Sequence, residues 1–309
     1  MLSTIAERYI DLHLAVGYRF RDESDLLRNF ARYATAQGDT LVRTETALAW
    51  AAQSPSAGAR RRRLVVVRRF SQRMRLEDPG NELPPPDTFG PRPLQRLPYI
   101  FAPESIRALL DAAASLGPPG SLRPKTYATL FGLLSCTGLR ISEALNLRPQ
   151  DFDATGQTLL IQPSKFSPAR RLPLQTSASV ALNQYDQFCQ QTLAQATRPA
   201  FFLNGYGRPL TRDYAEAVFA QVRARLGWTH DPVPRLHDLR HTFAVHCLVG
   251  WNRQAGGVDA KILALATYLG HRRVTDTYWY LSAIPQLLAS SAARFEQLAH
   301  STPEVQSHA

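Results

Sequence analysis

The sequence predicts a mainly α-helical fold with a small antiparallel β-sheet, divided into two domains. Apolar residues recur with helical spacing along most of the chain, and one pair of short β-type segments forms a candidate hairpin. The stretch 79–98 contains seven prolines, so it can neither continue a helix nor lie inside a sheet. We therefore expect a linker at 79–98 between a helical domain at 1–78 and a second domain at 99–290, with a C-terminal tail at 291–309.

The first domain is predicted to be wholly helical. Its first helix is expected to begin at Ser3, which can cap it, and to bury Ile5, Tyr9, Leu12 and Val16 on one face. A second helix is centred on 26–33, a third covers 44–52 and a fourth covers 60–76.

The second domain is predicted to be helical apart from the hairpin. The hairpin pairs TLLIQ (158–162) with RRLPL (170–174), and its turn contains Lys165. The predicted helices cover 103–115, 125–137, a short segment from 141, 176–195, 211–226, 235–250, 258–269, 273–282 and 285–298.

The charge balance favours a polyanionic partner. The net charge is +11, and 16 arginines stand against 11 acidic residues in 1–96, so the basic surplus is not confined to one half of the chain. The alternative is a basic protein from a GC-rich genome. No apolar run reaches the roughly 18 residues of a membrane span. Three scattered cysteines without CxxC spacing indicate reduced thiols, so we expect a cytoplasmic, nucleoid-associated protein.

The predicted helix 60–76 holds eight arginines and no acidic residue. Like charges at this density destabilise a helix unless an anion lies against them. Our hypothesis is that these side chains contact DNA phosphates and position the duplex, and the alternative is a solvated helix face. The residues expected at this interface are Arg60, Arg61, Arg62, Arg63, Arg68, Arg69 and Arg73.

The first motif that suggests chemistry is TGLRISEALNL at 137–147. Arg140 stands at the start of a predicted helix, and Glu143 lies one turn further on, where it can hold the guanidinium. Taken alone, this pair is also typical of an ordinary surface ion pair of little energetic value.

The second motif is RLHDLRHTFAVH at 235–246. His237 and Arg240 are three positions apart and share a helix face. His237 and His241 have the spacing of a zinc site, with Asp238 between them. No third ligand follows at a recognisable spacing, and Arg240 would place a cation beside the ion, so we expect no metal. Plain structural histidines are the other alternative.

The third motif, LGHRRVTDTYWYL at 269–281, places His271 just past a predicted helix end. Tyr278 and Tyr280 point to nearly opposite sides of a helix, so only one can enter a site. A phenol has a pKa of about 10 and needs a base or cations beside it to act as a nucleophile at pH 7. Arginine pairs suit the oxygens of a phosphodiester, and Lys165 can protonate a leaving hydroxyl, which arginine cannot.

The order of these motifs resembles that of the tyrosine recombinases, the phage integrase family: an arginine, a lysine on a hairpin, His-x-x-Arg, a histidine and a tyrosine. The match covers roughly residues 100–285, and the hairpin turn reads PSKFS where the family commonly has Gly-Lys-Gly. The family places its tyrosine about nine residues after the LGH histidine, which selects Tyr280 over Tyr278. The matching residues are Arg140, Lys165, His237, Arg240, His271 and Tyr280.

The resemblance implies a core-binding domain and an α+β catalytic domain that close around double-stranded DNA. Tyr280 would attack the scissile phosphate, giving a 3′-phosphotyrosine and a free 5′-hydroxyl. Arg140 and Arg240 would bind the non-bridging oxygens, and the two histidines would assist proton transfer and phosphate stabilisation. Lys165 would act as the acid.

The resemblance further implies a site-specific recombinase or integrase of a mobile element that needs no metal, ATP or other cofactor. It would work as a homotetramer on paired sites and be a monomer or dimer when free. The tail would dock onto a neighbouring protomer or remain disordered. Two other functions stay open: DNA relaxation like that of a type IB topoisomerase, and DNA binding without catalysis.

Overall fold

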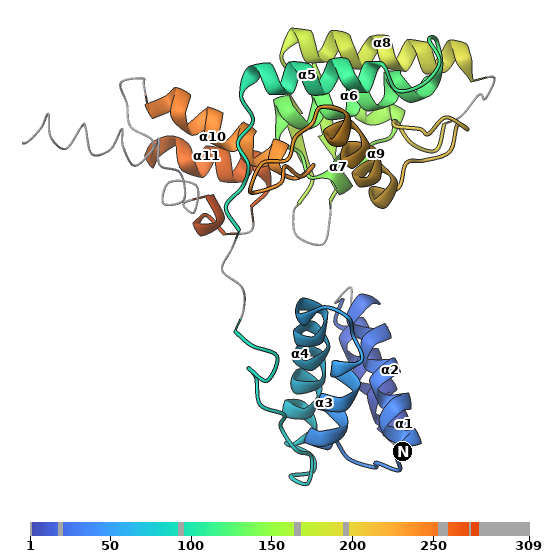
Figure 1. Ribbon diagram of the computed structural model, residues 1–309, viewed down its shortest axis with the longest axis vertical. Coiled ribbons are helices and arrows are strands. Elements are labelled where there is room, and N and C mark those ends of the chain that lie inside the picture. Colours follow the sequence, from blue (N-terminus) through green and yellow to red (C-terminus); the bar gives the residue numbers. More distant parts are fainter. Residues whose placement is uncertain are drawn as a thin grey trace, which may run out of the picture. The chain divides into compact units, whose positions relative to one another are not determined.

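The computed structural model describes residues 2–17, 21–91, 96–163, 168–193, 198–252, 259–271 and 273–277. The chain divides into two units, Met1–Gln95 and Arg96–Ala309 (Figure 1). In the described ranges no helix is long and apolar enough to cross a membrane. Lys165, Tyr278, Tyr280, the predicted helix 285–298 and the tail lie outside the described residues.

The N-terminal unit consists of helices around an aromatic core. The described helices are α1 (Leu2–Ala15), α2 (Arg21–Ala36), α3 (Thr44–Ala52) and α4 (Ala57–Met74). Trp50 and Phe30 meet edge to face at 5.3 Å, as do Tyr9 and Phe70. These fully or largely buried rings bring all of these helices to one core.

Helix α1 corrects two details of the prediction. It begins at Leu2, so Ser3 lies inside the helix, where its hydroxyl is 3.1 Å from that of Thr35. Leu12 is 53% exposed, because the buried face is formed by Leu2, Ala6, Tyr9 and Ile10, and Val16 is 64% exposed just beyond the end of the helix. Both stripes have helical spacing, and periodicity alone does not decide which of two overlapping apolar faces meets the core.

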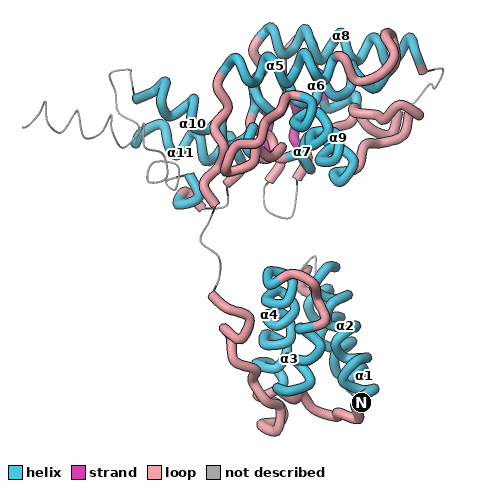
Figure 2. The backbone as a smooth tube through the Cα atoms, viewed as in Figure 1, coloured by secondary structure: helices cyan, strands magenta, loops and turns pink. Residues whose placement is uncertain are grey.

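From residue 103 to residue 269, the C-terminal unit has the predicted succession of helices, and most of the predicted helix 273–282 lies outside the described residues. They are α5 (Pro103–Ala114), α6 (Leu122–Thr137), α7 (Ile141–Leu145), α8 (Thr176–Thr192), α9 (Arg212–Arg225), α10 (Asp238–Asn252) and α11 (Asp259–Leu269). Figure 2 shows that helices form most of the regular secondary structure of this unit. Helix α6 is buried on most sides and packs against α5, α8 and α10, so it forms the centre of the core.

A three-stranded antiparallel sheet, in the order β1-β2-β3, lies in the same unit, and the predicted fold class is confirmed. The strands are β1 (Phe152–Asp153), β2 (Thr158–Ile161) and β3 (Arg170–Pro173). The predicted hairpin is present, and its last pair before the turn is Ile161 with Arg170. Strand β1 was not predicted, because two residues are too short to show an alternating pattern.

Candidate active site

The carboxyl end of α11 is the point around which the site is built. Gly270 has a φ of +66°, the left-handed conformation that ends many helices. Its N–H donates to the carbonyl of Thr267 at 3.0 Å, and the N–H of His271 donates to that of Ala266 at 2.9 Å. This pair of hydrogen bonds is a Schellman motif. It fixes the backbone of His271 immediately beyond the helix.

Three arginines satisfy the carbonyls that this helix end leaves over. The last carbonyls of a helix have no partner within it, and they carry the negative end of the helix dipole. The hydrogen bonds are Arg170 Nε to Tyr268 O at 2.8 Å, Arg240 Nη2 to Leu269 O at 2.8 Å and Arg140 Nη2 to Gly270 O at 2.7 Å. One helix end therefore gathers three guanidinium groups from three other elements.

Arg140 is also held by residues close to it in the sequence. Gly138 ends α6 with a φ of +62°, and Arg140 then caps α7. The carboxylate of Glu143 accepts hydrogen bonds from the Arg140 backbone N–H and from Nη1, both at 3.0 Å. Glu143 thus holds the guanidinium, as the sequence spacing predicted. The Arg140 side chain is 26% exposed, which leaves it open to a ligand.

Glu143 is shared with Arg170, which the sequence did not single out. Arg170 Nη1 and Nη2 donate to the two carboxylate oxygens of Glu143, each at 3.0 Å. Burial opposes ionisation of Glu143, but the hydrogen bonds from Arg170 and Arg140 outweigh it and hold the pKa of the carboxyl below its ordinary value. The result is a buried Arg–Glu–Arg network at the helix end.

Helix α10 supplies Arg240 and, just before its first residue, His237. Arg240 is 3% exposed, and its Nη1 also donates to the Gly138 carbonyl at 2.8 Å. The His237 ring stands perpendicular to that of His241, with the ring centres 4.7 Å apart. Asp238 is bound by Arg235. Across the ranges that the structure describes, no group of three His, Cys, Asp or Glu side chains is arranged to hold a metal.

His271 is anchored by a second contact. Its Nδ1 is 2.7 Å from the hydroxyl of Thr277, a fully buried residue. Burial, and then Arg240 and Arg140, lower the pKa of His271 to about 3. Desolvation and Arg240 also lower the pKa of His237. Burial and the neighbouring guanidinium groups therefore favour the neutral form of both imidazoles at pH 7.

Four of the six predicted catalytic residues thus lie in one cluster: Arg140, His237, Arg240 and His271. The proximity is visible in the electrostatics, because both arginines lower the pKa of both histidines. Lys165 and Tyr280 lie outside the described residues, so their side chains are not placed.

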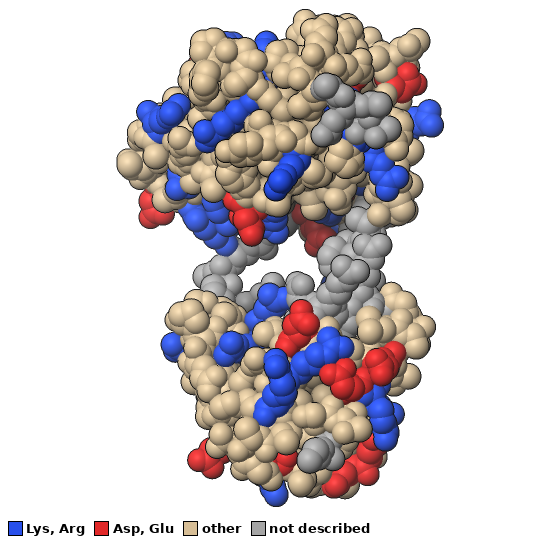
Figure 3. Space-filling model, turned by 90° about the vertical axis from the view of Figure 1, so that its right-hand side faces the viewer, with Lys and Arg blue, Asp and Glu red and all other residues tan. Residues whose placement is uncertain are grey.

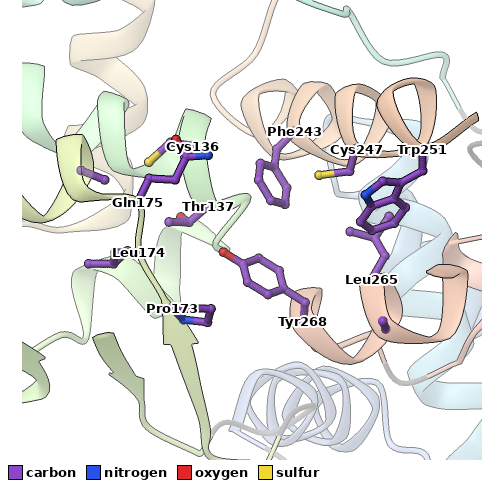
Figure 4. Close-up of a pocket in the computed structure, with 12 residues that line it drawn as sticks. Cys136, Thr137, Pro173, Leu174, Gln175, Phe243, Cys247, Trp251, Leu265 and Tyr268 are labelled. Carbon is purple, nitrogen blue, oxygen red and sulfur yellow. The ribbon is translucent and has the colours of Figure 1, made fainter. Parts of the chain in front are cut away.

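Tyr268 shows how a nearby phenol is kept out of the cluster. Its side chain extends from α11 toward Thr137 in an apolar pocket of about 360 Å³ (Figure 4). There it stacks on Phe243 with the ring centres 5.6 Å apart. Burial raises its pKa to about 12, the opposite of activation. Its backbone carbonyl accepts the hydrogen bond from Arg170 in the arginine cluster.

Most of the arginines of α4 have partners within their own unit. Arg63 Nη1 donates to the carbonyl of Trp50 at 3.0 Å, and its guanidinium lies 4.9 Å from the centre of that ring. The other pairs are Arg60 with Ser54 O, Arg61 with Phe89 O and Pro91 O, Arg69 with Glu23, and Arg73 with Glu77. Arg62 has a further contact. Arg68 forms neither a hydrogen bond nor an ion pair within the described part of the chain.

The N-terminal unit therefore supplies many of the partners for the α4 arginines that the sequence suggested a bound anion would supply. Figure 3 shows basic side chains on the surface of each unit, with acidic side chains close to many of those on the N-terminal unit. Contact of the α4 arginines with DNA stays a prediction.

This molecule has a small antiparallel sheet packed among helices and an arginine and histidine cluster at one helix end. These features are those expected of a tyrosine recombinase. Residues 100–286 match the model of the Phage integrase family, and the chain belongs to that family. The putative integrase/recombinase y4rB of Sinorhizobium fredii is 35% identical, over 94% of this chain and 96% of its own. Tyrosine recombinase XerD of Corynebacterium glutamicum is 32% identical, over 74% of this chain and 71% of its own. The chain is thus a tyrosine-type site-specific recombinase.

Solved structures share the fold. The Tn1549 transposon integrase, in complex with transposon right end DNA, superposes with a TM-score of 0.65 at 17% identity and covers 96% of this chain and 99% of its own. A lambda integrase dimer bound to a core site gives a TM-score of 0.59 at 16% identity, covering 90% of this chain and 76% of its own. At these identities the likeness concerns the fold alone.

Proposed function

We propose that this chain binds double-stranded DNA, cuts it at specific sites and rejoins it through a 3′-phosphotyrosine intermediate. The observation that carries the proposal is the cluster of Arg140 and Arg240 on the carboxyl end of α11, beside the neutral imidazoles of His237 and His271. Fixed cations bind the charge that develops on a phosphate in the transition state, and histidine is the side chain that most often transfers protons in catalysis.

In the first step the phenolic oxygen of Tyr280 attacks the scissile phosphorus. A bond forms between that oxygen and phosphorus, and the bond from phosphorus to the 5′-oxygen breaks. The phenolic proton passes to a histidine of the cluster, and Lys165 gives a proton to the leaving 5′-oxygen. Arg140 and Arg240 hold the non-bridging oxygens throughout. Attack by the 5′-hydroxyl of a partner strand then reverses these changes and releases the tyrosine.

The described backbone supports the parts assigned to Lys165 and Tyr280. Arg170, the first residue of β3, pairs with Ile161 in the hairpin and contacts Glu143 in the cluster, and Lys165 lies between these two strand residues in the sequence. Thr277, three residues before Tyr280, is hydrogen-bonded to His271. In the sequence, Lys165 stands five positions before Arg170 and Tyr280 stands three positions after Thr277, so each is close to a residue bound to the cluster.

The proposed partner is a pair of recombination sites held by a homotetramer, with the α4 arginines on the DNA backbone. The structural relatives support DNA as the partner, because the Tn1549 integrase and lambda integrase were both solved with DNA. The Tn1549 relative belongs to a transposon, which supports a role in integration or transposition of a mobile element.

The test is covalent capture of DNA. The full chain is incubated with a plasmid library of random inserts, denatured, and recovered with any attached DNA, whose ends are sequenced to give a cleavage site. A nicked duplex of that sequence then traps the adduct, and mass spectrometry identifies the modified residue. Tyr280→Phe should bind this duplex and form no adduct, whereas the matched control Tyr278→Phe should still cleave.

An adduct at Tyr278 would show that the tyrosine assignment is wrong, and no adduct from the wild-type chain would refute the proposed chemistry. Relaxation of any plasmid by the monomer, without a preferred sequence, would favour the topoisomerase alternative.

A further inference from the structure

Glu143 creates an electrostatic problem for the proposed phosphate site. Its carboxylate is 3% exposed and lies 3.0 Å from Arg140, the more open of the two arginines that are proposed to bind phosphate. A carboxylate this close cancels much of the field that a guanidinium presents to an anion, and water screens a buried pair poorly. If Glu143 had Arg140 as its sole partner, it would hold the side chain in place and weaken it as an anion ligand.

Arg170 is placed to resolve this problem. It pairs with both oxygens of Glu143 from the inner side, and its side chain is 10% exposed against 26% for Arg140. With Arg240 included, three positive charges face one negative charge, which leaves a surplus of two. Without Arg170 the surplus would fall to one, and Glu143 would pair with Arg140 alone.

The Arg170 side chain also stabilises the carboxyl end of α11, on which the site is built. Arg170 Nε donates to the carbonyl of Tyr268 at 2.8 Å, and Nη2 lies 3.4 Å from that of Leu269. These carbonyls immediately precede Gly270 and His271. Arg171, the next residue, is exposed on the strand. It therefore offers a control of the same type and charge, one position away.

We propose that Arg170 is a positioning residue for strand cleavage: it balances the charge of Glu143, so that Arg140 is held in place and still presents its positive charge to the scissile phosphate. Arg170 itself does not touch the DNA. This inference rests on the proposed function, since it assigns Arg140 to the phosphate.

The experiment compares the cleavage rates of two substrates. One is the nicked duplex recovered by covalent capture. The other has the same sequence but carries a methylphosphonate at the scissile position, so that the reacting group has lost its negative charge. Cleavage is followed in single turnover with the duplex saturated by protein, and the dissociation constant is measured separately. Cleavage is counted whether the adduct persists or hydrolyses.

Arg170→Gln is expected to slow cleavage of the phosphodiester by about 30-fold and to change the dissociation constant by less than about threefold. On the methylphosphonate the defect should shrink to within about fivefold, because there is less charge for Arg140 to neutralise. Arg171→Gln should cleave the saturated phosphodiester at the wild-type rate.

The double variant Glu143→Gln/Arg170→Gln distinguishes a role of Arg170 in balancing the charge of Glu143 from a purely structural role. It removes both charges of the inner pair together and leaves no buried carboxylate short of a partner, so it is expected to fold. On the phosphodiester it should cleave about tenfold faster than Arg170→Gln. If Arg170→Gln does not fold, the double variant and Arg170→Lys carry the test. Both should cleave within about tenfold of wild type, because neither leaves the Glu143 carboxylate without an inner positive charge.

An equal defect on both substrates, or a wild-type rate for Arg170→Gln, would overturn the inference. So would a double variant no faster than a folded Arg170→Gln, or, where that variant does not fold, cleavage by either substitute more than about tenfold below wild type. Failure of the wild-type chain to form any adduct would instead count against the proposed function.

Discussion

Replacing Gly138 by alanine tests the geometry of the site without any knowledge of its DNA. Gly138 has a φ of +62°, and a Cβ atom built there would lie 2.5 Å from Cδ1 of Phe243 and 3.0 Å from Cδ2 of Leu269. The substitution therefore combines a left-handed conformation that alanine disfavours with a clash against α10 and the end of α11.

The expected cost follows from these two terms. The left-handed conformation costs alanine about 1–2 kcal/mol, and displacement of packed core atoms costs about 1–3 kcal/mol. The smaller entropy of the unfolded alanine chain offsets about 0.4–1 kcal/mol. The free energy of unfolding should therefore fall by about 1–4.6 kcal/mol. A loss of about 3 kcal/mol would lower the melting midpoint of a unit of this size by about 6–12 °C.

Urea unfolding of the full chain, followed by circular dichroism, measures the effect. The matched control is Gly132→Ala, six residues earlier in α6, where the added Cβ would lie 3.8 Å from Leu110 and no positive φ is needed. This control should raise stability by about 0.5–1 kcal/mol, since alanine is the better residue inside a helix. The two substitutions should thus have opposite signs.

The same change should also impair cleavage. The Gly138 carbonyl accepts a hydrogen bond from Arg240, so a shift of this turn moves an acceptor of a predicted catalytic arginine. At a temperature where Gly138→Ala is fully folded, we expect cleavage at least about tenfold slower than wild type. A variant with wild-type stability would refute the account of the α6 end, whichever way its activity turned out.

Three further predictions concern other parts of the molecule. Thr277→Val, which deletes the hydroxyl bonded to His271, should slow cleavage about tenfold, whereas Thr277→Ser should stay within about twofold of wild type; equal rates for the two variants would contradict it. Because the pKa values of His271 and His241 are both lowered to about 3, the unfolded chain takes up protons below pH 6.5 that the folded chain does not. The free energy of unfolding should therefore fall between pH 7 and pH 5, by about 1–3 kcal/mol after allowance for partial exposure, and a constant urea midpoint would exclude this. In α4, Arg63→Ala should lower the free energy of unfolding by about 1–2 kcal/mol, because it loses the contacts with Trp50. Arg68→Ala should leave the free energy of unfolding unchanged and reduce the slope of log DNA affinity against log salt concentration by about one. The reverse pattern would show that both assignments are wrong.

The sequence predicted the local features of this molecule well, because they depend on residues close together in the chain. The helices from 103 to 269 and the hairpin follow from spacing, and the Arg140–Glu143 contact spans three positions. The common face of His237 and Arg240 has the same origin. The two exposed residues of the predicted α1 stripe, Leu12 and Val16, and the missed strand β1 arose where the local pattern was ambiguous or too short.

Arg170 was beyond sequence reasoning, because its partners are distant in the chain. Glu143 lies 27 positions away and Tyr268 lies 98 positions away. In a chain this rich in arginine, nothing local distinguishes it from its neighbour Arg171. The partners of the α4 arginines could not be predicted from the sequence either. Their density was visible, but the backbone carbonyls that bind Arg60, Arg61 and Arg63 cannot be read from side-chain types.

The end of α11 explains why so many cations can be held in one place. Like charges repel, so three arginines gather only where acceptors are fixed beforehand, and here these are three successive carbonyls and one carboxylate. The left-handed Gly270 ends the helix so that those carbonyls stay free of intrahelical bonds, and the same turn sets His271 beside them. The arginines and this histidine therefore share one anchor and cannot be displaced independently. For that reason the effects of substituting them should not add, and each substitution should be interpreted as a change to the whole helix end.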